Sequence, residues 1–232
     1  MPASTRAFAD NAADPKVRGY LHTPATANEM GLVLSHGAGS NAQAPLLVAL
    51  AETFAAAGFT VLRCDLPYRQ TRSFGPPGPA DAARDRAGLS NAVAAIRKIT
   101  PGRVILGGHS YGGRQSSMLC AELAKQSPEE VTNLPAALLL LSYPLHPPRK
   151  PEQQRTQHLP DLRTPTLFVH GTRDPFGSIA ELEQAIKMIP ARTKLVAIEG
   201  AGHDLGFKGK AKQEELGNLI LQELTNFLNL SS

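Results

Sequence analysis

The sequence alternates short apolar runs with longer segments in which apolar residues recur three or four positions apart. The short runs are continuously apolar, as strands must be when helices cover both faces of a sheet. They lie at residues 31–35, 60–64, 104–108, 137–141, 165–169 and 194–198. The longer segments, which predict crossover helices, lie at residues 46–57, 82–99, 114–125, 179–189 and 214–228. We therefore predict an α/β fold, a three-layer sandwich with a mostly parallel sheet and helices on both faces.

The rest of the chain predicts one domain preceded by a tail. Residues 1–16 are small and polar and lack a period, so we expect a loose N-terminal tail, and residues 17–232 then form a single domain. Residues 17–23 predict an antiparallel first strand. Two proline-rich connections, residues 66–80 and 142–164, are longer than most loops, and loops of that length in a compact domain are commonly functional.

Composition excludes several classes of function. The net charge of +4 comes without any block of like charges, so we expect no nucleic-acid partner. We find no apolar stretch of membrane-spanning length and no signal peptide, so we expect no membrane association and a cytoplasmic location. Cys64 and Cys120 lie in apolar contexts, which predicts buried free thiols. No His or Cys cluster has metal-ligand spacing, so we expect no metal and no cofactor.

The strand at residues 104–108 runs into Gly108-His109-Ser110-Tyr111-Gly112 and then into a helix. A turn that lifts a serine off a strand end and starts a helix at once crowds the backbone, so the positions two before and two after tolerate little beyond glycine. The turn also places the Tyr111 amide at a helix N-terminus, where it is directed at the position at which negative charge develops. Gly-x-Ser-x-Gly occurs in ordinary glycine-rich turns too, but the flanking strand and helix favour a nucleophile.

A nucleophilic serine needs a base, and the base needs a group that orients it. Asp174 follows the strand at residues 165–169, and His203 lies in a glycine-rich loop after the strand at residues 194–198. Taken alone, Asp174 is typical of a turn before proline and His203 of a solvated loop. Because successive parallel strands end at one edge of a sheet, the order Ser, Asp, His predicts that the three side chains meet as catalytic residues.

A glycine-rich segment, His36-Gly37-Ala38-Gly39, follows an early strand. At that position a backbone amide can complete an oxyanion hole, and Ala38 is the predicted donor beside Tyr111. We expect His36 to anchor this loop rather than to titrate in catalysis. A phosphate-binding loop is the weaker alternative, because no Gly-Lys-Ser/Thr follows.

Together, these motifs resemble those of a small α/β-hydrolase over residues 31–205. Within that superfamily the chain resembles the dienelactone-hydrolase-like group. It is more similar still to a set of uncharacterised predicted hydrolases related to a histone-acetyltransferase-complex subunit. Residues 142–148 and 172–177 carry this narrower resemblance.

Two departures limit what the resemblance implies. Dienelactone hydrolases use a cysteine nucleophile, whereas position 110 is serine, so we do not expect their specific reaction. Many superfamily members insert a helical cap before the acid, but this chain has only residues 142–164 there. We therefore expect no substantial cap domain and a shallow, open pocket.

These patterns predict a serine hydrolase that cleaves a small soluble carboxylic ester or thioester through an acyl-enzyme. Ser110 attacks, His203 transfers the proton, Asp174 orients His203, and the Ala38 and Tyr111 amides hold the oxyanion. Two alternatives stay open: a non-catalytic binding or scaffold protein with a hydrolase fold, and an acyltransferase. The identity of the substrate and the oligomeric state are open too.

Further residues at the same predicted sheet edge are candidates for substrate binding, although a structural role is at least as well supported. These candidates are His36, Tyr68, Arg69, Tyr143 and His146. Arg69 and Arg72 are the arginines we would test for recognition of a substrate carboxylate. We expect His109 to pack beneath Ser110, and His170 to order the loop that carries Asp174.

Overall fold

The sheet of the computed structural model has eight strands in the order β1-β2-β4-β3-β5-β6-β7-β8. The structure describes residues 3–126, 134–207 and 210–229. The strands are β1 (Ser4–Asp10), β2 (Val17–Thr23), β3 (Gly31–Ser35), β4 (Thr60–Cys64), β5 (Val104–His109), β6 (Ala137–Leu141), β7 (Thr166–Gly171) and β8 (Thr193–Ile198). Strands β3 to β8 run parallel, and β1 and β2 are antiparallel additions at one edge.

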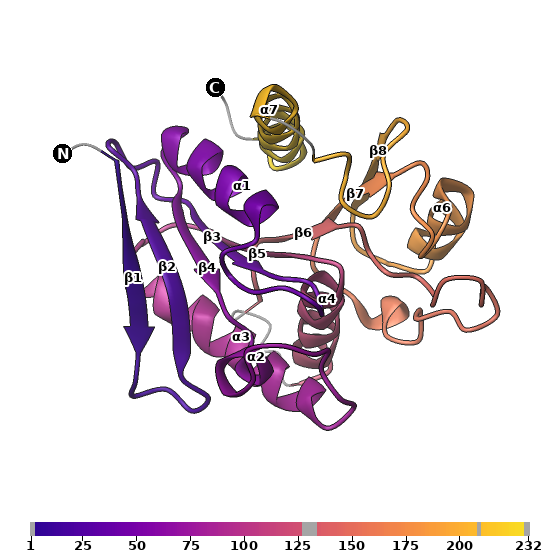
Figure 1. Ribbon diagram of the computed structural model, residues 1–232, viewed down its shortest axis with the longest axis horizontal. Helices are drawn as coiled ribbons and strands as arrows, with labels where there is room; N and C mark the ends of the chain where they lie inside the picture. Colours follow the sequence, from indigo (N-terminus) through magenta and orange to yellow (C-terminus); the bar gives the residue numbers. More distant parts are fainter. Residues whose placement is uncertain (1–2, 127–133, 208–209, 230–232) are drawn as a thin grey trace.

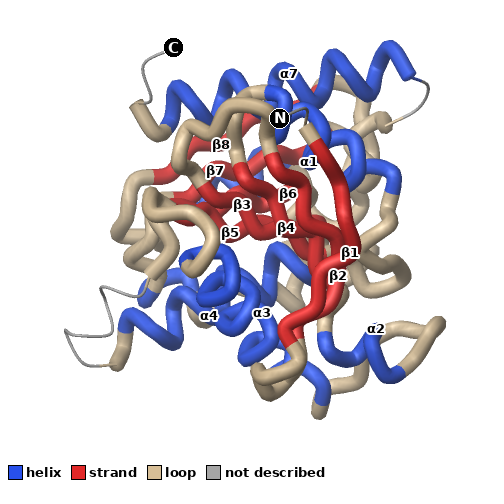
Figure 2. Tube along the Cα trace, turned by 90° about the vertical axis from the view of Figure 1, so that its left-hand side faces the viewer, coloured by secondary structure: helices blue, strands red, loops and turns tan. Residues whose placement is uncertain are grey.

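Helices cover both faces of this sheet (Figures 1 and 2). The helices among the described residues are α1 (Pro45–Ala56), α2 (Pro67–Thr71), α3 (Asp81–Arg97), α4 (Tyr111–Ala124), α6 (Ile179–Ile186) and α7 (Lys210–Phe227), with a short 3-10 turn η1 (Leu159–Asp161). Figure 2 shows α1 and α7 on one side of the strands and α3 and α4 on the other. The predicted three-layer α/β sandwich is confirmed, as is the antiparallel strand at residues 17–23.

The continuous apolar runs arise because each central strand packs against helices on both sides. In β3, Leu32 and Leu34 belong to the core under α1 and α7, whereas Val33 belongs to the core under α3 and α4. All three side chains are fully buried. Burial of one such side chain stabilises the fold by about 1.5–3 kcal/mol, so an alternating polar pattern at these strands would remove one of the two cores.

The N-terminal residues correct one prediction. Instead of a loose tail over residues 1–16, Ser4–Asp10 forms β1, which pairs with β2 from Ser4 opposite Thr23 to Asp10 opposite Val17. In β1, Phe8 and one other residue are partly buried and the other residues are exposed. The Phe8 side chain packs against the core. The backbone ladder holds this edge strand in place, and a ladder leaves no apolar period in the sequence.

The two long connections contain short helices that the sequence did not reveal. Pro67 begins α2, as expected of proline at a first helical position, and η1 lies in the second connection. The segment between β6 and β7 holds only η1, so it has no cap domain, as predicted. Cys64 and Cys120 are buried and free.

Among the residues that the structure describes, no helix combines the length and the apolar character needed to cross a membrane.

Candidate active site

Three side chains from separate strand ends meet at the carboxyl edge of the sheet. Ser110 follows β5, Asp174 follows β7, and His203 lies in the loop after β8. His203 Nε2 lies 2.8 Å from Ser110 Oγ, and His203 Nδ1 lies 2.8 Å from Asp174 Oδ2. The Asp174 side chain is fully buried, and the His203 side chain is 25% exposed. The structure therefore brings together the three residues that the sequence predicted, in one hydrogen-bonded chain.

Ser110 occupies a strained backbone conformation at the start of α4. Its φ of 52° and ψ of −115° lie where non-glycine residues are rarely found. A Cβ atom on Gly112 would come within 2.6 Å of the His36 carbonyl oxygen, and one on Gly108 within 2.3 Å of Ser35 Oγ. Both glycines are thus required by close packing against the end of β3. The tight turn leaves the Ser110 hydroxyl directed at His203.

The loop after β7 holds Asp174 in place. Asp174 Oδ1 accepts a hydrogen bond of 2.9 Å from the Phe176 amide, so that Oδ2 is left to His203. The Phe176 ring stacks on the His203 ring, with 4.3 Å between their centroids. His170 Nε2 donates to the Gly177 carbonyl at 2.8 Å, and burial lowers the pKa of His170. A neutral His170 therefore ties the two ends of the acid loop together, as the sequence led us to expect.

His109 has a more specific contact than the predicted packing beneath Ser110. Its Nε2 donates a hydrogen bond of 2.8 Å to the carbonyl oxygen of His203. Burial lowers the pKa of His109, so that its imidazole stays neutral and serves as a fixed donor. The residue before the candidate nucleophile therefore holds the backbone of the candidate base.

Two backbone amides are free to receive an oxyanion. Within the described residues, neither the Ala38 nor the Tyr111 amide donates a hydrogen bond to another group. The Ala38 carbonyl, on the other side of that residue, accepts from Tyr68 Oη at 2.8 Å and from Arg69 Nη2 at 3.1 Å. Because its carbonyl is fixed, the loop around Ala38 has a defined orientation.

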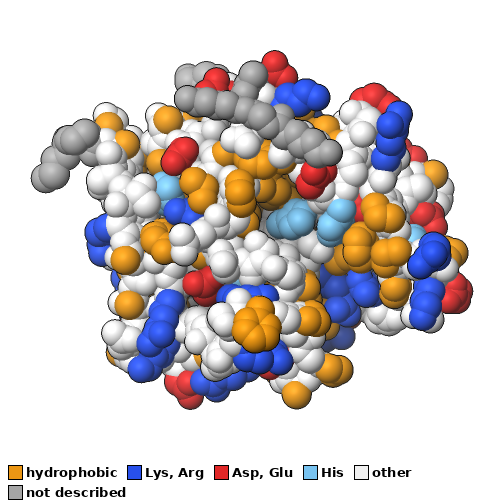
Figure 3. Space-filling view, in the orientation of Figure 1, with side chains coloured by type: hydrophobic (Ala, Val, Ile, Leu, Met, Phe, Trp, Pro, Cys, Tyr) orange, Lys and Arg blue, Asp and Glu red, His pale blue; other side chains and the backbone are white. Residues whose placement is uncertain are grey.

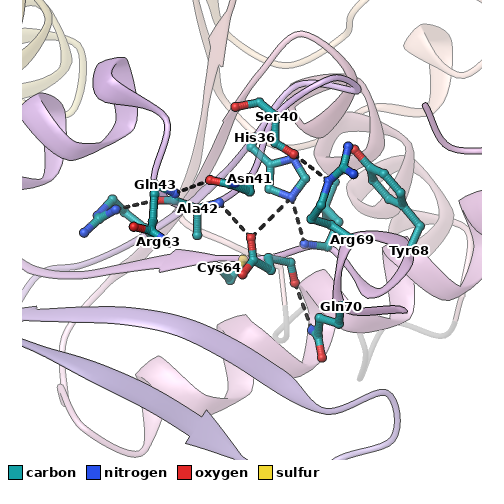
Figure 4. Close-up of polar contacts among 12 residues, drawn as sticks. His36, Ser40, Asn41, Ala42, Gln43, Arg63, Cys64, Tyr68, Arg69 and Gln70 are labelled. Atoms are coloured by element: carbon teal, nitrogen blue, oxygen red, sulfur yellow. Dashed lines mark hydrogen bonds and ion pairs between the residues drawn. The ribbon is translucent and has the colours of Figure 1, made fainter. Parts of the chain in front are cut away.

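Arg69 and His36 brace the same loop from opposite ends. Arg69 Nε donates to the Ser40 carbonyl at 2.8 Å, and Figure 4 shows this side chain directed at Ser40 beside His36 and Tyr68. His36 is fully buried; its Nδ1 donates to the Gly37 carbonyl at 2.9 Å and its Nε2 accepts from the Leu66 amide at 3.1 Å. Burial lowers the pKa of His36, which matches its anchoring role.

Each of the five residues that the sequence offers for substrate binding makes hydrogen bonds within the protein, in line with the structural role left open for them. Tyr143 and His146 are 1% and 5% exposed; the Tyr143 hydroxyl donates to the Arg155 carbonyl at 2.7 Å, and His146 Nδ1 donates to the Pro147 carbonyl at 2.8 Å. The Tyr143 hydroxyl and His146 Nδ1 thus hold loops, and none of the five candidates lines the cavity at Ser110. These five residues are His36, Tyr68, Arg69, Tyr143 and His146, and substrate binding by them stays a prediction from sequence. The backbone groups of loops at a sheet edge need hydrogen-bond partners, and polar side chains there can serve the loops as well as a substrate.

A cavity of about 460 Å³ opens beside Ser110. Its wall includes Ala38, Tyr111 and Phe176, three prolines of the first long connection (Pro76, Pro77 and Pro79), and two arginines, Arg114 and Arg155. Figure 3 shows histidine side chains reaching the surface near the middle of one face, with hydrophobic side chains on either side and Lys and Arg side chains below them. Sequence reasoning missed both arginines as site residues. For Arg114 the available signal was its position one helical turn after Ser110.

No group of three or more His, Cys, Asp and Glu side chains suited to a metal ion lies among the residues described. The arrangement that is present can polarise a hydroxyl, carry its proton through an imidazole and hold negative charge on two amides. Those are the elements of acyl transfer to and from a serine.

Comparison with known proteins agrees with this fold. Residues 28–228 match a family model described as an alpha/beta hydrolase domain. The structure of a dienelactone hydrolase from Anabaena variabilis superposes with a TM-score of 0.71 at 23% identity, covering 96% of this chain and 99% of that one. An α/β serine hydrolase without a lid, XC6422 from Xanthomonas campestris, gives a TM-score of 0.70 at 14% identity over 100% of this chain and 98% of that one.

Two further proteins are similar to all or part of this chain. Est1E from Butyrivibrio proteoclasticus superposes with a TM-score of 0.67 at 16% identity, over 99% of this chain and 100% of that one. A polyketide synthase, ThaQ from Burkholderia thailandensis, is 52% identical over 48 residues, which are 21% of this chain. The matched segment spans 2% of the synthase.

Proposed function

The chain belongs to the α/β-hydrolase domain family, and we propose that it is a serine hydrolase that cleaves a small soluble carboxylic ester or thioester through an acyl-enzyme. One observation carries the proposal: two successive contacts of 2.8 Å link Ser110 Oγ to His203 and His203 to the buried Asp174. The similarity in fold to a lidless serine hydrolase supports it.

In the first half of the reaction, Ser110 Oγ attacks the carbonyl carbon of the substrate while its proton moves to His203 Nε2. The carbonyl electron pair shifts to oxygen, and the amides of Ala38 and Tyr111 donate hydrogen bonds to that oxyanion. When the carbonyl re-forms, the bond to the leaving alcohol or thiol breaks, and His203 returns its proton to the leaving group. The acyl group then remains on Ser110.

In the second half, a water molecule gives a proton to His203 Nε2 and attacks the acyl carbon. The resulting oxyanion accepts hydrogen bonds from the same two amides. When it collapses, the carboxylic acid is released and Ser110 Oγ takes the proton back from His203. Asp174 keeps the His203 ring in the orientation in which Nε2 faces Ser110, and its charge stabilises the imidazolium that forms in each half.

An acyltransferase would carry out the same first half of the reaction and would differ only in the molecule that accepts the acyl group in the second half. A hydrolase and an acyltransferase therefore differ in their response to added alcohols or amines. A non-catalytic scaffold would form no acyl-enzyme at all. Three further points stay predictions from sequence. They are the similarity to predicted hydrolases related to a histone-acetyltransferase-complex subunit, the cytoplasmic location, and the absence of nucleic-acid and membrane partners.

A panel of short p-nitrophenyl esters and acyl thioesters tests the proposal. We expect turnover by the wild-type protein, a loss of at least about 1,000-fold in Ser110→Ala, and a loss of about 100- to 10,000-fold in Asp174→Asn. Ser4→Ala, which changes an exposed serine of β1, is the matched control and keeps full activity. Ser110-independent turnover, or no turnover of the whole panel, contradicts the proposal.

A further inference from the structure

The cavity beside Ser110 is lined by two charged side chains, both of them positive. Arg114 and Arg155 belong to its wall, whereas no Asp or Glu does. None of the ion pairs found among the described residues includes either arginine. A guanidinium is always charged and weakly hydrated, and in a partly enclosed site it favours a bound anion.

Arg114 lies one turn into α4 from Ser110, and its amide donates to the Ser110 carbonyl at 2.9 Å. Residues four apart share a helix face, so its side chain extends from the side of α4 that also presents Ser110. Its Nε is buried and has no hydrogen-bond partner in the described part of the chain. Such an orphaned charged donor is costly unless an acceptor binds nearby.

Gln115, the next residue, adds a second unpaired donor to the same wall. Its Oε1 accepts a hydrogen bond of 3.0 Å from Arg86 Nη1. Because a guanidinium can only donate, this contact fixes which end of the amide faces Arg86. Gln115 Nε2 is thereby left buried and without a partner within the described residues.

Arg155 approaches from the second long connection. Its Nη1 donates to the Pro144 carbonyl at 3.1 Å, which holds the side chain against the cavity and uses one of its five donors. The hydroxyl of Tyr143 lies beside both arginines, but burial raises the pKa of Tyr143 to about 12 against their charges. The Tyr143 phenol therefore stays neutral and does not offset the positive charges of the two arginines. Burial and the charge of Arg114 lower the pKa of Arg155, as expected where two cations lie close together.

The arginines that the sequence suggested for this task are already occupied. Arg69 donates to four carbonyl oxygens, including those of Ala38 and Ser40, and Arg72 is paired with Asp81. The guanidinium groups available to a substrate therefore belong to Arg114 and Arg155.

We propose that this cavity selects esters or thioesters that carry a second, anionic oxygen group, such as a carboxylate, and that Arg114 and Arg155 bind this group together. The inference rests on the proposed function, because it places the anion relative to an acyl group on Ser110.

Two matched pairs of esters test the inference and distinguish which half of the substrate carries the anion. Monoethyl glutarate and ethyl pentanoate differ by a carboxylate on the acyl side. The carboxymethyl ester and the ethyl ester of butanoic acid differ by one on the alcohol side. Acid release is followed in a pH-stat, and the readout is the ratio of kcat/KM between the members of each pair.

We expect the wild-type protein to prefer the anionic member of at least one pair by about 10- to 100-fold, the range of one or two charge-assisted hydrogen bonds. Arg114→Gln and Arg155→Gln each reduce that ratio by about 10-fold or more, chiefly through KM. Arg114→Lys, which keeps the positive charge but loses the two parallel donors of the guanidinium, reduces the ratio less. Arg84→Gln removes an exposed arginine paired with Asp14 and leaves the ratio unchanged.

Thermal melting of each variant establishes that it is folded, and the Lys variant keeps the test valid if Arg114→Gln does not fold. Ser110-dependent turnover without an anionic preference, or a preference that all the arginine variants retain, overturns this inference and leaves the hydrolase assignment standing. Failure of every ester, together with an unreactive Ser110, overturns the hydrolase assignment and this inference with it.

Discussion

His109 Nε2 donates a hydrogen bond of 2.8 Å to the carbonyl oxygen of His203, so the strand that presents the candidate nucleophile also holds the loop that presents the candidate base. The two imidazole centroids lie 5.1 Å apart. The same loop is also held at Ala201, whose carbonyl accepts from the Arg173 amide at 2.8 Å, and at Gly200, whose amide donates to Thr172 Oγ1 at 2.8 Å. The His109 contact adds a restraint on the backbone of His203 itself and so helps to set the position of its ring relative to Ser110.

Loss of this contact is expected to affect turnover more than binding. His109→Ala should lower kcat by about 10- to 100-fold with little change in KM, because a small misplacement of a base is expensive in the transition state. His109→Gln, which retains a side-chain donor, should recover much of the loss. Steady-state kinetics on the best ester of the panel measure both. Equal losses in the two variants, or a change confined to KM, would mean that His109 does not position His203.

Arg69 is expected to act through the loop that carries Ala38. Arg69→Met removes the bonds to the Ala38 and Ser40 carbonyls while keeping the apolar stem, so kcat should fall by about 10-fold or more as the oxyanion amide loses its orientation. Tyr68→Phe removes one bond to the same carbonyl and should have a smaller effect in the same direction. Arg84→Met serves as the surface control. A kcat for Arg69→Met within twofold of the wild type would argue against this account.

The nucleophile turn should not tolerate a methyl group. In Gly112→Ala the new Cβ would meet Ser35 Oγ at 2.5 Å and the His36 carbonyl oxygen at 2.6 Å, so the backbone must shift. We expect the free energy of unfolding to fall by about 1–3 kcal/mol, as for other overpacked sites. At Gly39 a Cβ would have no neighbour within 4 Å, so Gly39→Ala is the matched control and should change stability by less than about 0.5 kcal/mol. Urea unfolding of both variants gives the comparison.

His22 should make stability depend on pH. It is 2% exposed, its Nε2 accepts from Arg63 Nε at 2.9 Å, and burial together with the Arg63 charge lowers its pKa to about 4. In the unfolded chain the imidazole gains a proton below pH 6.5 and in the folded chain only near pH 4. Its contribution is therefore present above pH 6.5 and is lost as the pH falls toward 4.

Urea unfolding at pH 7.5 and pH 5 measures this effect. Between those values the wild type should lose about 2 kcal/mol more than His22→Gln does, after correction for the difference between the two proteins at pH 7.5. An identical pH dependence in both proteins would mean that His22 takes up its proton equally in the folded and unfolded states.

The central strands could be predicted because they have to be buried on two faces. The runs at residues 31–35, 60–64 and 137–141 coincide with β3, β4 and β6, since a continuous apolar stretch has few other uses in a chain of this kind. Strand β1 was missed because it lies at an edge: five of its seven residues are exposed, and its register comes from backbone bonds to β2. Backbone pairing has no direct signature in side-chain pattern.

The candidate site divides in the same way. Ser110, Asp174 and His203 could be predicted to meet, because parallel strands deliver their carboxyl ends to one edge and the residue types fit one chemistry. The roles of Arg69 and Arg155 could not, since both depend on which carbonyl groups the long connections turn toward them. An arginine free for a ligand and one bound to the backbone look the same in a sequence.

Labelling with a fluorophosphonate tests the central claim most directly, because such probes react with a serine only when a base and an oxyanion site activate it. We expect one adduct per chain by intact mass, located at Ser110 by peptide mapping. It should be absent from Ser110→Ala and strongly slowed in Asp174→Asn. A folded wild-type protein that forms no adduct at Ser110 would contradict the account.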